Sequence, residues 1–384
     1  MNSFDSILAG ELQELEKADL RRTLRVVDTS LVNFAANDYL GLAGHPVLVA
    51  AAREATARHG TGSGASRLVT GTDEAVLALE AELAAWKEKE AVLVFSSGFA
   101  AALGTIPALV GKGDTVILDK LSHASLIDAA RLSGATVRTF AHNDVGRLES
   151  VLRKVASDGG RTLIVTESIF SMDGDAAPLA EIVALKEKHG AWLFVDEAHA
   201  TGLYGRTGAG RIAEAGLSDR VEIVMGTLSK ALGSVGGYIA GSRTLIDWLV
   251  NRARSFVYST ALPPGVIAAS HAAVKLADSA AGAVQRARLW GRIARFHAGL
   301  PERWKKESLS MSAIQPLICG EASAALAMAT ALRERGFLIP AIRYPTVPRG
   351  SARLRVTLSA GHSDAEIDAL NRVLAELGQA GRHA

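Results

Sequence analysis

The chain has 384 residues, of which 48% are hydrophobic and 21% charged, a balance that excludes an intrinsically disordered protein. Its 42 Lys and Arg residues exceed its 40 Asp and Glu residues by only two, so no strong field points to nucleic acid or to an anionic membrane. A lone cysteine, Cys319, excludes a disulfide framework. Neither a signal-peptide pattern nor an apolar run of about 18 residues is present. We therefore expect a cytoplasmic, enzyme-sized globular protein without a membrane or nucleic-acid partner.

The first segment, residues 1–45, is expected to form an N-terminal arm. Apolar residues recur at helical spacing from Phe4 to Leu15, with acidic residues on the other face, which predicts an amphipathic helix. A strand-like stretch follows at 31–42. A single helix cannot bury its own apolar stripe, so the arm should pack on the body of the protein or on a partner subunit.

Residues 46–270 are expected to form a large α/β domain. Thr72 is expected to cap one helix, and another should run from Pro178 to a stop at Gly190. Short apolar runs alternate with such helical patterns and predict buried strands at 91–95, 115–119, 135–140, 162–168, 191–197 and 221–227. This alternation is typical of a mostly parallel central sheet with helices on both faces.

Residues 271–384 are expected to form a smaller α+β C-terminal domain, because the strand–helix rhythm weakens there. Strands are predicted in AIQPLICG, FLIPAIRYPTVP and SARLRVTLSAGHS, and helices at 321–335 and 363–378. The prolines of PTVP (345–348) would interrupt a central strand, so this segment should be an edge or a loop.

The strongest chemical signal is the pair of motifs VDEAHATG and GTLSKALG. Asp196 lies at the tip of one predicted strand, with His199 three residues on, and Lys230 lies in a turn after the next strand. Ligands of open α/β sheets gather at such strand ends. A lysine desolvated there can form an imine, and a neighbouring carboxylate can keep a pyridine nitrogen protonated. Together with an anion cradle, these groups indicate a pyridoxal phosphate enzyme.

A phosphate cradle is predicted where a strand runs into a helix at Ser97, Gly98 and Phe99. Thr227, three residues before the lysine, can place its hydroxyl on the same phosphate. The competing glycine-rich stretch at 60–72 follows a helical pattern and not a strand, so a dinucleotide-binding dehydrogenase is poorly supported.

Three further polar residues are candidates for the cofactor ring. His123, at the start of a predicted helix, is equally suited to stack on the pyridine face or to cap the helix. Ser171 and His199 are candidates for hydrogen bonds to the phenolic oxygen. The ten histidines show no metal-ligand spacing, so no metal is expected.

These residues lie in motifs that resemble the α-oxoamine synthases, a family of fold-type I pyridoxal phosphate transferases. The resemblance covers nearly the whole chain. It rests on NFAANDYLGL, GSGASRLVTG, FSSGFAAA, LSHASL, FAHNDV, FSMDGDAAPL, VDEAHATG, TLSKALG and YSTALPP. SAIQPLI and AIRYPTVPRGSARLRVTLSA are most similar to the branch that condenses L-alanine with a pimeloyl thioester in biotin biosynthesis.

The resemblance implies a role for each matching residue. Lys230 would carry the cofactor, Asp196 would pair with the ring nitrogen, and His123 would stack on the ring and assist the condensation. The implied cofactor contacts are Gly98, Phe99, Ser171, His199, Thr227 and, from the opposite subunit of a homodimer, Thr260. Arg355 would bind the amino-acid carboxylate, and Arg21 and Thr346 would contact substrate, although Arg21 is also explained as a solvated charge at a helix end.

Two alternatives stay open at this point. TLSKA occurs in sister enzymes too, so the acyl donor could be that of a 2-amino-3-oxobutyrate ligase or a 5-aminolevulinate synthase, both of which use glycine. The pimeloyl group could equally be carried as a thioester of coenzyme A or of an acyl carrier protein. A catalytically silent relative that acts as a scaffold is the alternative from another class, and the intact Asp196, His199 and Lys230 argue against it.

Overall fold

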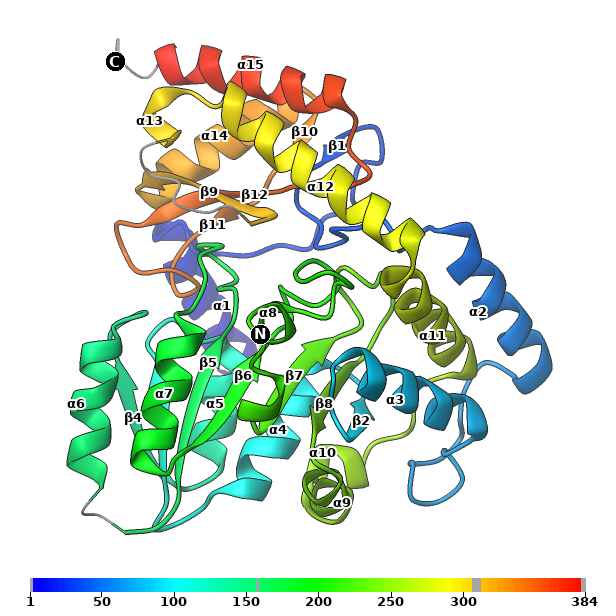
Figure 1. Ribbon diagram of the computed structural model, residues 1–384. Coiled ribbons are helices and arrows are strands. Elements are labelled where there is room, and N and C mark those ends of the chain that lie inside the picture. Colours follow the sequence, from blue (N-terminus) through cyan, green and yellow to red (C-terminus); the bar gives the residue numbers. More distant parts are fainter. Residues whose placement is uncertain (1–2, 157–158, 306–311, 381–384) are drawn as a thin grey trace. The chain divides into compact units, whose positions relative to one another are not determined.

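A computed structural model describes residues 3–156, 159–305 and 312–380 (Figure 1). The chain divides into two compact units. The first takes in the residues up to Ala36, the short segment Met172–Gly174, and the residues from Trp290 on. The second takes in Asn37–Ser171 and Asp175–Leu289. The predicted domain boundaries at 45 and 270 stay a prediction.

The second unit is built on a seven-stranded sheet with the order β2-β8-β7-β6-β5-β3-β4. Its strands are β2 (Ala91–Phe95), β3 (Thr115–Asp119), β4 (Thr136–Phe140), β5 (Thr162–Glu167), β6 (Trp192–Asp196), β7 (Ile223–Thr227) and β8 (Gly237–Gly241). The pairs from β7 to β4 are parallel, whereas β8 is antiparallel to both neighbours. The predicted mostly parallel sheet is confirmed, and β8 is the strand that the sequence analysis missed.

Helices cover this sheet and explain why most of its strands are largely apolar. Leu93, Leu118 and Val165 join a core cluster with residues of α4, α5, α9 and α10, while Ile117 and Ile164, which alternate with them along the strands, are also buried. Both faces of these inner strands are therefore shielded from water, whereas the edge strand β4 is exposed at three of its five residues. The helices are α2 (Pro46–His59), α3 (Glu74–Trp86), α4 (Gly98–Leu109), α5 (Ala124–Leu132), α6 (Val145–Val155), α7 (Leu179–His189), α8 (Arg211–Glu214), α9 (Arg243–Arg252), α10 (Arg254–Val257) and α11 (Pro264–Asp278).

The helix ends agree with the predictions except at α3. The predicted cap Thr72 is wrong: Asp73 is the N-cap, and its carboxylate accepts from the backbone N–H of Val76 at 2.9 Å. Thr72 lies one residue too early and donates instead to the carbonyl of Arg67. At α7 the predicted stop is confirmed, since Gly190 adopts the left-handed conformation with φ 64°.

The first unit holds a three-stranded antiparallel sheet in the order β11-β12-β9 and a parallel pair, β1-β10. The strands are β1 (Val32–Asn33), β9 (Ile314–Gly320), β10 (Phe337–Leu338), β11 (Ala341–Ile342) and β12 (Ala352–Thr357), and the helices are α1 (Ser3–Lys17), α13 (Glu302–Lys305), α14 (Ala322–Glu334) and α15 (Asp364–Ala380). α12 (Ala280–Gly299) begins in the second unit and ends in the first. The predicted C-terminal strands and helices are confirmed, and PTVP forms a loop after the edge strand β11.

The N-terminal arm forms the predicted helix, α1, but the helix has no buried residue. Phe4 is 64% exposed and Leu15 is 42% exposed. The strand-like stretch after it pairs only at Val32 and Asn33. The apolar stripe of α1 is thus not covered by the described part of this chain.

Among the described residues, none of the helices has the length and apolar character needed to cross a bilayer.

Candidate active site

Lys230 and His199 meet at the edge of the sheet where the parallel strands end. His199 follows β6, and Lys230 follows its neighbour β7. Lys230 Nζ is 2.8 Å from His199 Nε2. On the other side of the ring, His199 Nδ1 is 2.6 Å from the hydroxyl of the fully buried Tyr39. The lysine and the histidine that the sequence singled out are therefore in direct contact.

A chain of hydrogen bonds assigns the roles of the two ring nitrogens of His199. The Tyr39 hydroxyl donates to Asn37 Oδ1 at 3.1 Å, so its oxygen accepts from the Nδ1–H of His199. An imidazole that donates from Nδ1 presents an acceptor at Nε2. Lys230 accordingly donates its proton to Nε2, and the ring is held in one tautomer and one orientation.

Two buried carboxyl groups lie beside this pair. Asp196 ends β6 and Glu167 ends β5, and the two residues are partners in the parallel register. They are 5% and 2% exposed. Burial raises the pKa of both carboxyls, and the positive charge of Lys230 opposes the shift. Asp196 is also oriented by the backbone N–H of Ala198, which donates to Oδ1 at 2.8 Å.

His123 lies at the start of α5, next to the same carboxyl groups. Its Nδ1 accepts from the backbone N–H of Ser125 at 3.3 Å, so the ring caps the helix. Its own backbone N–H donates to Glu167 Oε1 at 2.5 Å. Burial and the nearby charge of Lys230 lower the pKa of His123, which keeps the ring neutral. The cap is present in the structure, and stacking on a cofactor ring stays a prediction.

The predicted phosphate cradle lies where β2 runs into α4. Ser97 caps the helix by accepting from the backbone N–H of Ala100 at 3.0 Å. Gly98 and Phe99 form the first turn, whose N–H groups have no partner within the helix and favour an anion. Thr227, at the end of β7, faces this turn, because a Cβ built on Gly98 would be 3.8 Å from the Cβ of Thr227.

The missed strand β8 closes the cradle from the side. Gly237 begins β8 and pairs with both Phe95 and Thr227. A Cβ at Gly237 would be 2.4 Å from the backbone nitrogen of Gly98, which is closer than real Cβ atoms approach. Glycine is therefore required there for β8 to lie against the turn that starts α4.

Ser171 and Thr260 complete the candidates in the second unit. Ser171 is half-buried in a turn that follows β5. Thr260 is exposed and forms an isolated antiparallel bridge with Ser66, in the glycine-rich stretch that the sequence analysis considered for a nucleotide. That stretch follows the helix α2, as expected.

The remaining candidates lie in the first unit. Arg355, on β12, is buried and donates to the Thr357 hydroxyl at 3.1 Å. Arg21 is exposed and pairs with Glu16 at 2.5 Å. Thr346 is also exposed, and its hydroxyl accepts from Arg22 Nη2 at 3.1 Å.

Sequence reasoning missed Asn37, Tyr39 and Glu167. Asn37 and Tyr39 lie in NFAANDYLGL, which was considered as a strand, and Glu167 lies in TES at a predicted strand end. The strand-end rule that selected Asp196 applies equally to Glu167. No local pattern could have linked Tyr39 to His199, because the two are 160 residues apart.

This set of donors fits pyridoxal phosphate. Lys230 supplies an amine, Asp196 supplies a buried carboxyl one strand away, and the turn at Gly98 supplies N–H groups beside the Thr227 hydroxyl. Buried carboxyls whose pKa is raised by burial gain most from a new positive charge nearby, such as a protonated ring nitrogen.

Comparison with known proteins agrees with this chemistry. Residues 29–374 match the family model described as aminotransferase class I and II. A structure named serine palmitoyltransferase, from Sphingomonas wittichii, superimposes with a TM-score of 0.90 at 32% identity, covering 99% of this chain and 98% of that one. A structure described as SPT with PLP superimposes with a TM-score of 0.89 at 30% identity over 98% of both chains. The chain thus belongs to the class I and II aminotransferase family, and its fold is that of these structures.

Relatives that are more similar in sequence identify the branch of this family to which the chain belongs. An 8-amino-7-oxononanoate synthase from Methylobacterium sp. (strain 4-46) is 47% identical over 98% of both chains. One from Geobacter sulfurreducens is 46% identical over 97% of this chain and 98% of its own. A solved 8-amino-7-oxononanoate synthase from Francisella tularensis has a TM-score of 0.76 at 28% identity, covering 92% of this chain and 99% of that one. The chain belongs to the 8-amino-7-oxononanoate synthase family.

Proposed function

We propose that the chain uses pyridoxal phosphate to condense L-alanine with a pimeloyl thioester, giving 8-amino-7-oxononanoate, coenzyme A or its carrier equivalent, and CO2. The observation that carries this proposal is the contact of Lys230 with His199 beside the buried Asp196. It occurs in a chain that is 47% identical, over nearly its full length, to enzymes named for this product.

The residues of the second unit would hold the cofactor at three points. Lys230 would tether it, Asp196 would keep its ring nitrogen protonated, and the turn at Gly98 and Phe99, with Thr227, would hold its phosphate. Ser171 and His199 would address the ring oxygen. When bound, the cofactor supplies an acceptor for the electron pair that remains on the alanine Cα after deprotonation.

The chain's own part in the reaction is the movement of one proton. When its Nζ is not bound to the cofactor, Lys230 could accept the Cα proton of alanine at that nitrogen and later return it. His199 Nε2 lies 2.8 Å from that nitrogen and can hold it in position through the cycle. Because Tyr39 fixes the tautomer of His199, the Nε2 acceptor stays available to the amine.

We assign the binding of the two substrate carboxylates to residues of the first unit. The planar fork of Arg355 suits the carboxylate of alanine. Arg21 is assigned to the far carboxylate of the pimeloyl chain, and Thr346 to a further contact with substrate. His123 would assist the attack on the thioester. The acyl donor is the pimeloyl thioester of either coenzyme A or an acyl carrier protein, and comparing the rates with the two thioesters would distinguish them.

We also propose a homodimer with the active site at its interface, acting in the cytoplasm. Two observations support the dimer. Thr260 is exposed on this chain, as expected for a residue donated to a neighbour, and α1 has an apolar stripe that the described residues leave uncovered. A second copy would bury both.

A thiol-release panel tests the function. Purified enzyme is mixed with alanine or glycine and with pimeloyl-, acetyl- or succinyl-coenzyme A, and the product mass is measured. We expect the fastest release from alanine with the pimeloyl thioester. Faster release from glycine with a short thioester would assign the chain to a sister enzyme, and a colourless protein that takes up no pyridoxal phosphate would identify a silent relative.

A further inference from the structure

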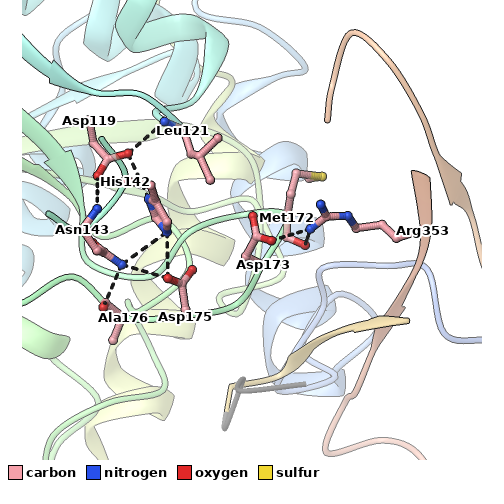
Figure 2. A network of polar contacts seen from close by, with 9 residues as sticks. All are labelled: Asp119, Leu121, His142, Asn143, Met172, Asp173, Asp175, Ala176 and Arg353. Carbon is pink, nitrogen blue, oxygen red and sulfur yellow. Dashed lines mark hydrogen bonds and ion pairs between the residues drawn. The ribbon is translucent and has the colours of Figure 1, made fainter. Parts of the chain in front are cut away.

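A second cluster of acidic residues around a histidine lies at the same edge of the sheet and has no part in the mechanism above. His142, just after β4, lies between two carboxylates, as Figure 2 shows. Its Nδ1 is 3.0 Å from Asp119 at the end of β3, and its Nε2 is 2.8 Å from Asp175. Asn143 strengthens the cluster, since its side-chain amide donates to Asp175 at 2.8 Å.

The geometry makes His142 a cation. Both ring nitrogens face carboxylate oxygens, and an imidazole can donate from both only when it carries two protons. Burial alone would lower the pKa of His142, but hydrogen bonds and charge attraction from Asp119 and Asp175 raise it to about 10. The ring also meets the edge of Phe170 at 4.4 Å between centroids.

This cation holds a turn that carries a proposed cofactor contact. The turn runs from Ser168 to Ala177 and is closed by backbone hydrogen bonds from Phe170 to Asp175 at 3.0 Å and from Ala177 to Ser168 at 3.2 Å. Ser171 lies at its centre. Phe170 and Asp175, which His142 contacts from two sides, are partners in the closing bond.

The tip of the turn has a separate attachment within the first unit. Met172–Gly174 belong to that unit, although the residues on either side belong to the second. Asp173 there forms an ion pair with the buried Arg353 of β12, also drawn in Figure 2. Because the tip is held independently, loss of His142 should loosen the base of the turn without releasing the whole segment.

We propose that His142 is a positioning residue for Ser171: it bridges Asp119 and Asp175, and so fixes the turn that presents the serine hydroxyl to the cofactor ring oxygen. The second half of this statement rests on the proposed function, whereas the first does not. Asp119 and Asp175 are the charged groups that face the ring from the elements packed around it.

The test compares His142→Gln with a matched control, His271→Gln. His271 lies in α11, 3.7 Å from a single carboxylate, Glu82, and away from the turn. Amide hydrogen exchange of the cofactor-free protein is measured first. We expect the amides of Phe170 and Ala177 to exchange at least tenfold faster in His142→Gln and at the parental rate in the control. Parental exchange in both variants would overturn the proposal.

The absorbance of the cofactor-loaded protein is then titrated with pH. We expect His142→Gln to move the midpoint of the cofactor band in the same direction as Ser171→Ala, and the double variant to move it no further. Additive shifts would overturn the link to Ser171. If Phe170 and Ala177 lose protection but Ser171→Ala leaves the spectrum unchanged, the turn is held as proposed, and it is the assigned role of Ser171 that fails.

A second variant guards against misfolding of the first. Asp175→Asn keeps the contact of His142 with Asp119 and removes only the charge on the turn side. It should reproduce the faster exchange of Phe170 and the same spectral shift. Parental behaviour of a folded Asp175→Asn protein in both measurements would overturn the proposal.

Discussion

Two clusters of histidine and carboxyl side chains lie at one edge of the sheet, but a different residue carries the positive charge in each. Around His142, the imidazolium pairs with the carboxylates of Asp119 and Asp175. At the candidate active site, Asp196 and Glu167 lie side by side, and Lys230 opposes the raised pKa of each. In the first cluster the histidine is the cation, whereas in the second the histidine is a neutral acceptor for the lysine.

The difference teaches how a binding site can be told from a structural ion cluster. The carboxylates around His142 already have their cation within hydrogen-bonding distance. Asp196 and Glu167 are buried too, and burial raises the pKa of both, so a further positive charge beside them would be stabilised. The carboxyl side of the site favours a positively charged group on a ligand, whereas the His142 cluster favours a fixed backbone.

The largest expected effect comes from the amine of the site. Lys230→Ala should lose essentially all turnover, because the tether and the proton-accepting group disappear together. In the parent, borohydride should fix the cofactor on the peptide that contains Lys230, as read by mass spectrometry. Lys188→Ala, an exposed lysine paired with Glu149, is the control and should react like the parent. Parental turnover of Lys230→Ala would refute the assignment.

The next largest effect is expected when the carboxyl group of Asp196 in the candidate active site is neutralised. Asp196→Asn should keep the fold but leave the ring nitrogen without its proton. Exchange of the alanine Cα–H in deuterated water should slow by orders of magnitude, at about tenfold for each 1.4 kcal/mol of lost stabilisation. The exposed Asp247→Asn variant in α9 controls for the loss of an acidic residue. Unchanged exchange would mean that another acid protonates the ring.

A smaller effect is expected from the two arginines assigned to the carboxylates of alanine and of the pimeloyl chain, which belong to neither cluster. Arg355→Ala should weaken alanine use first, and Arg21→Ala should weaken pimeloyl use selectively, each by roughly 1.5–3 kcal/mol, with the exposed Arg21 at the lower end. Arg335→Ala, an exposed arginine paired with Glu376, is the control. KM for each substrate is the measurement, and equal loss of both substrates in the Arg21 variant would contradict the division.

The last effect is on stability and not on activity, and it belongs to the His142 cluster alone. The folded pKa of about 10 lies above the ordinary value of 6.5, so the stabilisation is complete below pH 6.5 and is lost as the pH rises towards 10. Over that range the free energy of unfolding should fall by up to about 1.4 kcal/mol per pH unit more steeply in the parent than in His142→Gln. Urea unfolding at pH 6.5, 8 and 9.5 measures the slopes, and parallel slopes would show that His142 is not charged.

The sequence predicted the parts of the molecule that depend on local pattern. Buried strands of this sheet are largely apolar, so β2, β3, β5 and β7 stand out from the helices between them. β8 was missed because glycines flank its short apolar core, Tyr238–Ala240, and resemble a loop. Thr72 was preferred over Asp73 as a cap because both residue types suit that position, and only the backbone geometry distinguishes them.

The candidate site divides in the same way. Lys230, Asp196 and Gly98 follow strands directly, so their meeting at one edge could be expected from the topology. Tyr39 and His142 act through partners that lie far away in the sequence. His142, for example, meets carboxylates 23 residues before it and 33 residues after it. Only the folded chain shows such contacts.

The close approach of Gly237 to Gly98 has a consequence for how this site could change. A methyl group at position 237 would press on the first turn of α4 without adding or removing any charge. Gly237→Ala should therefore weaken retention of a phosphate-bearing cofactor more than that of a phosphate-free analogue, although every charged residue of the site is intact. Phosphate binding here depends on how closely two backbone segments approach, and position 237 has room for a hydrogen atom but not for a methyl group.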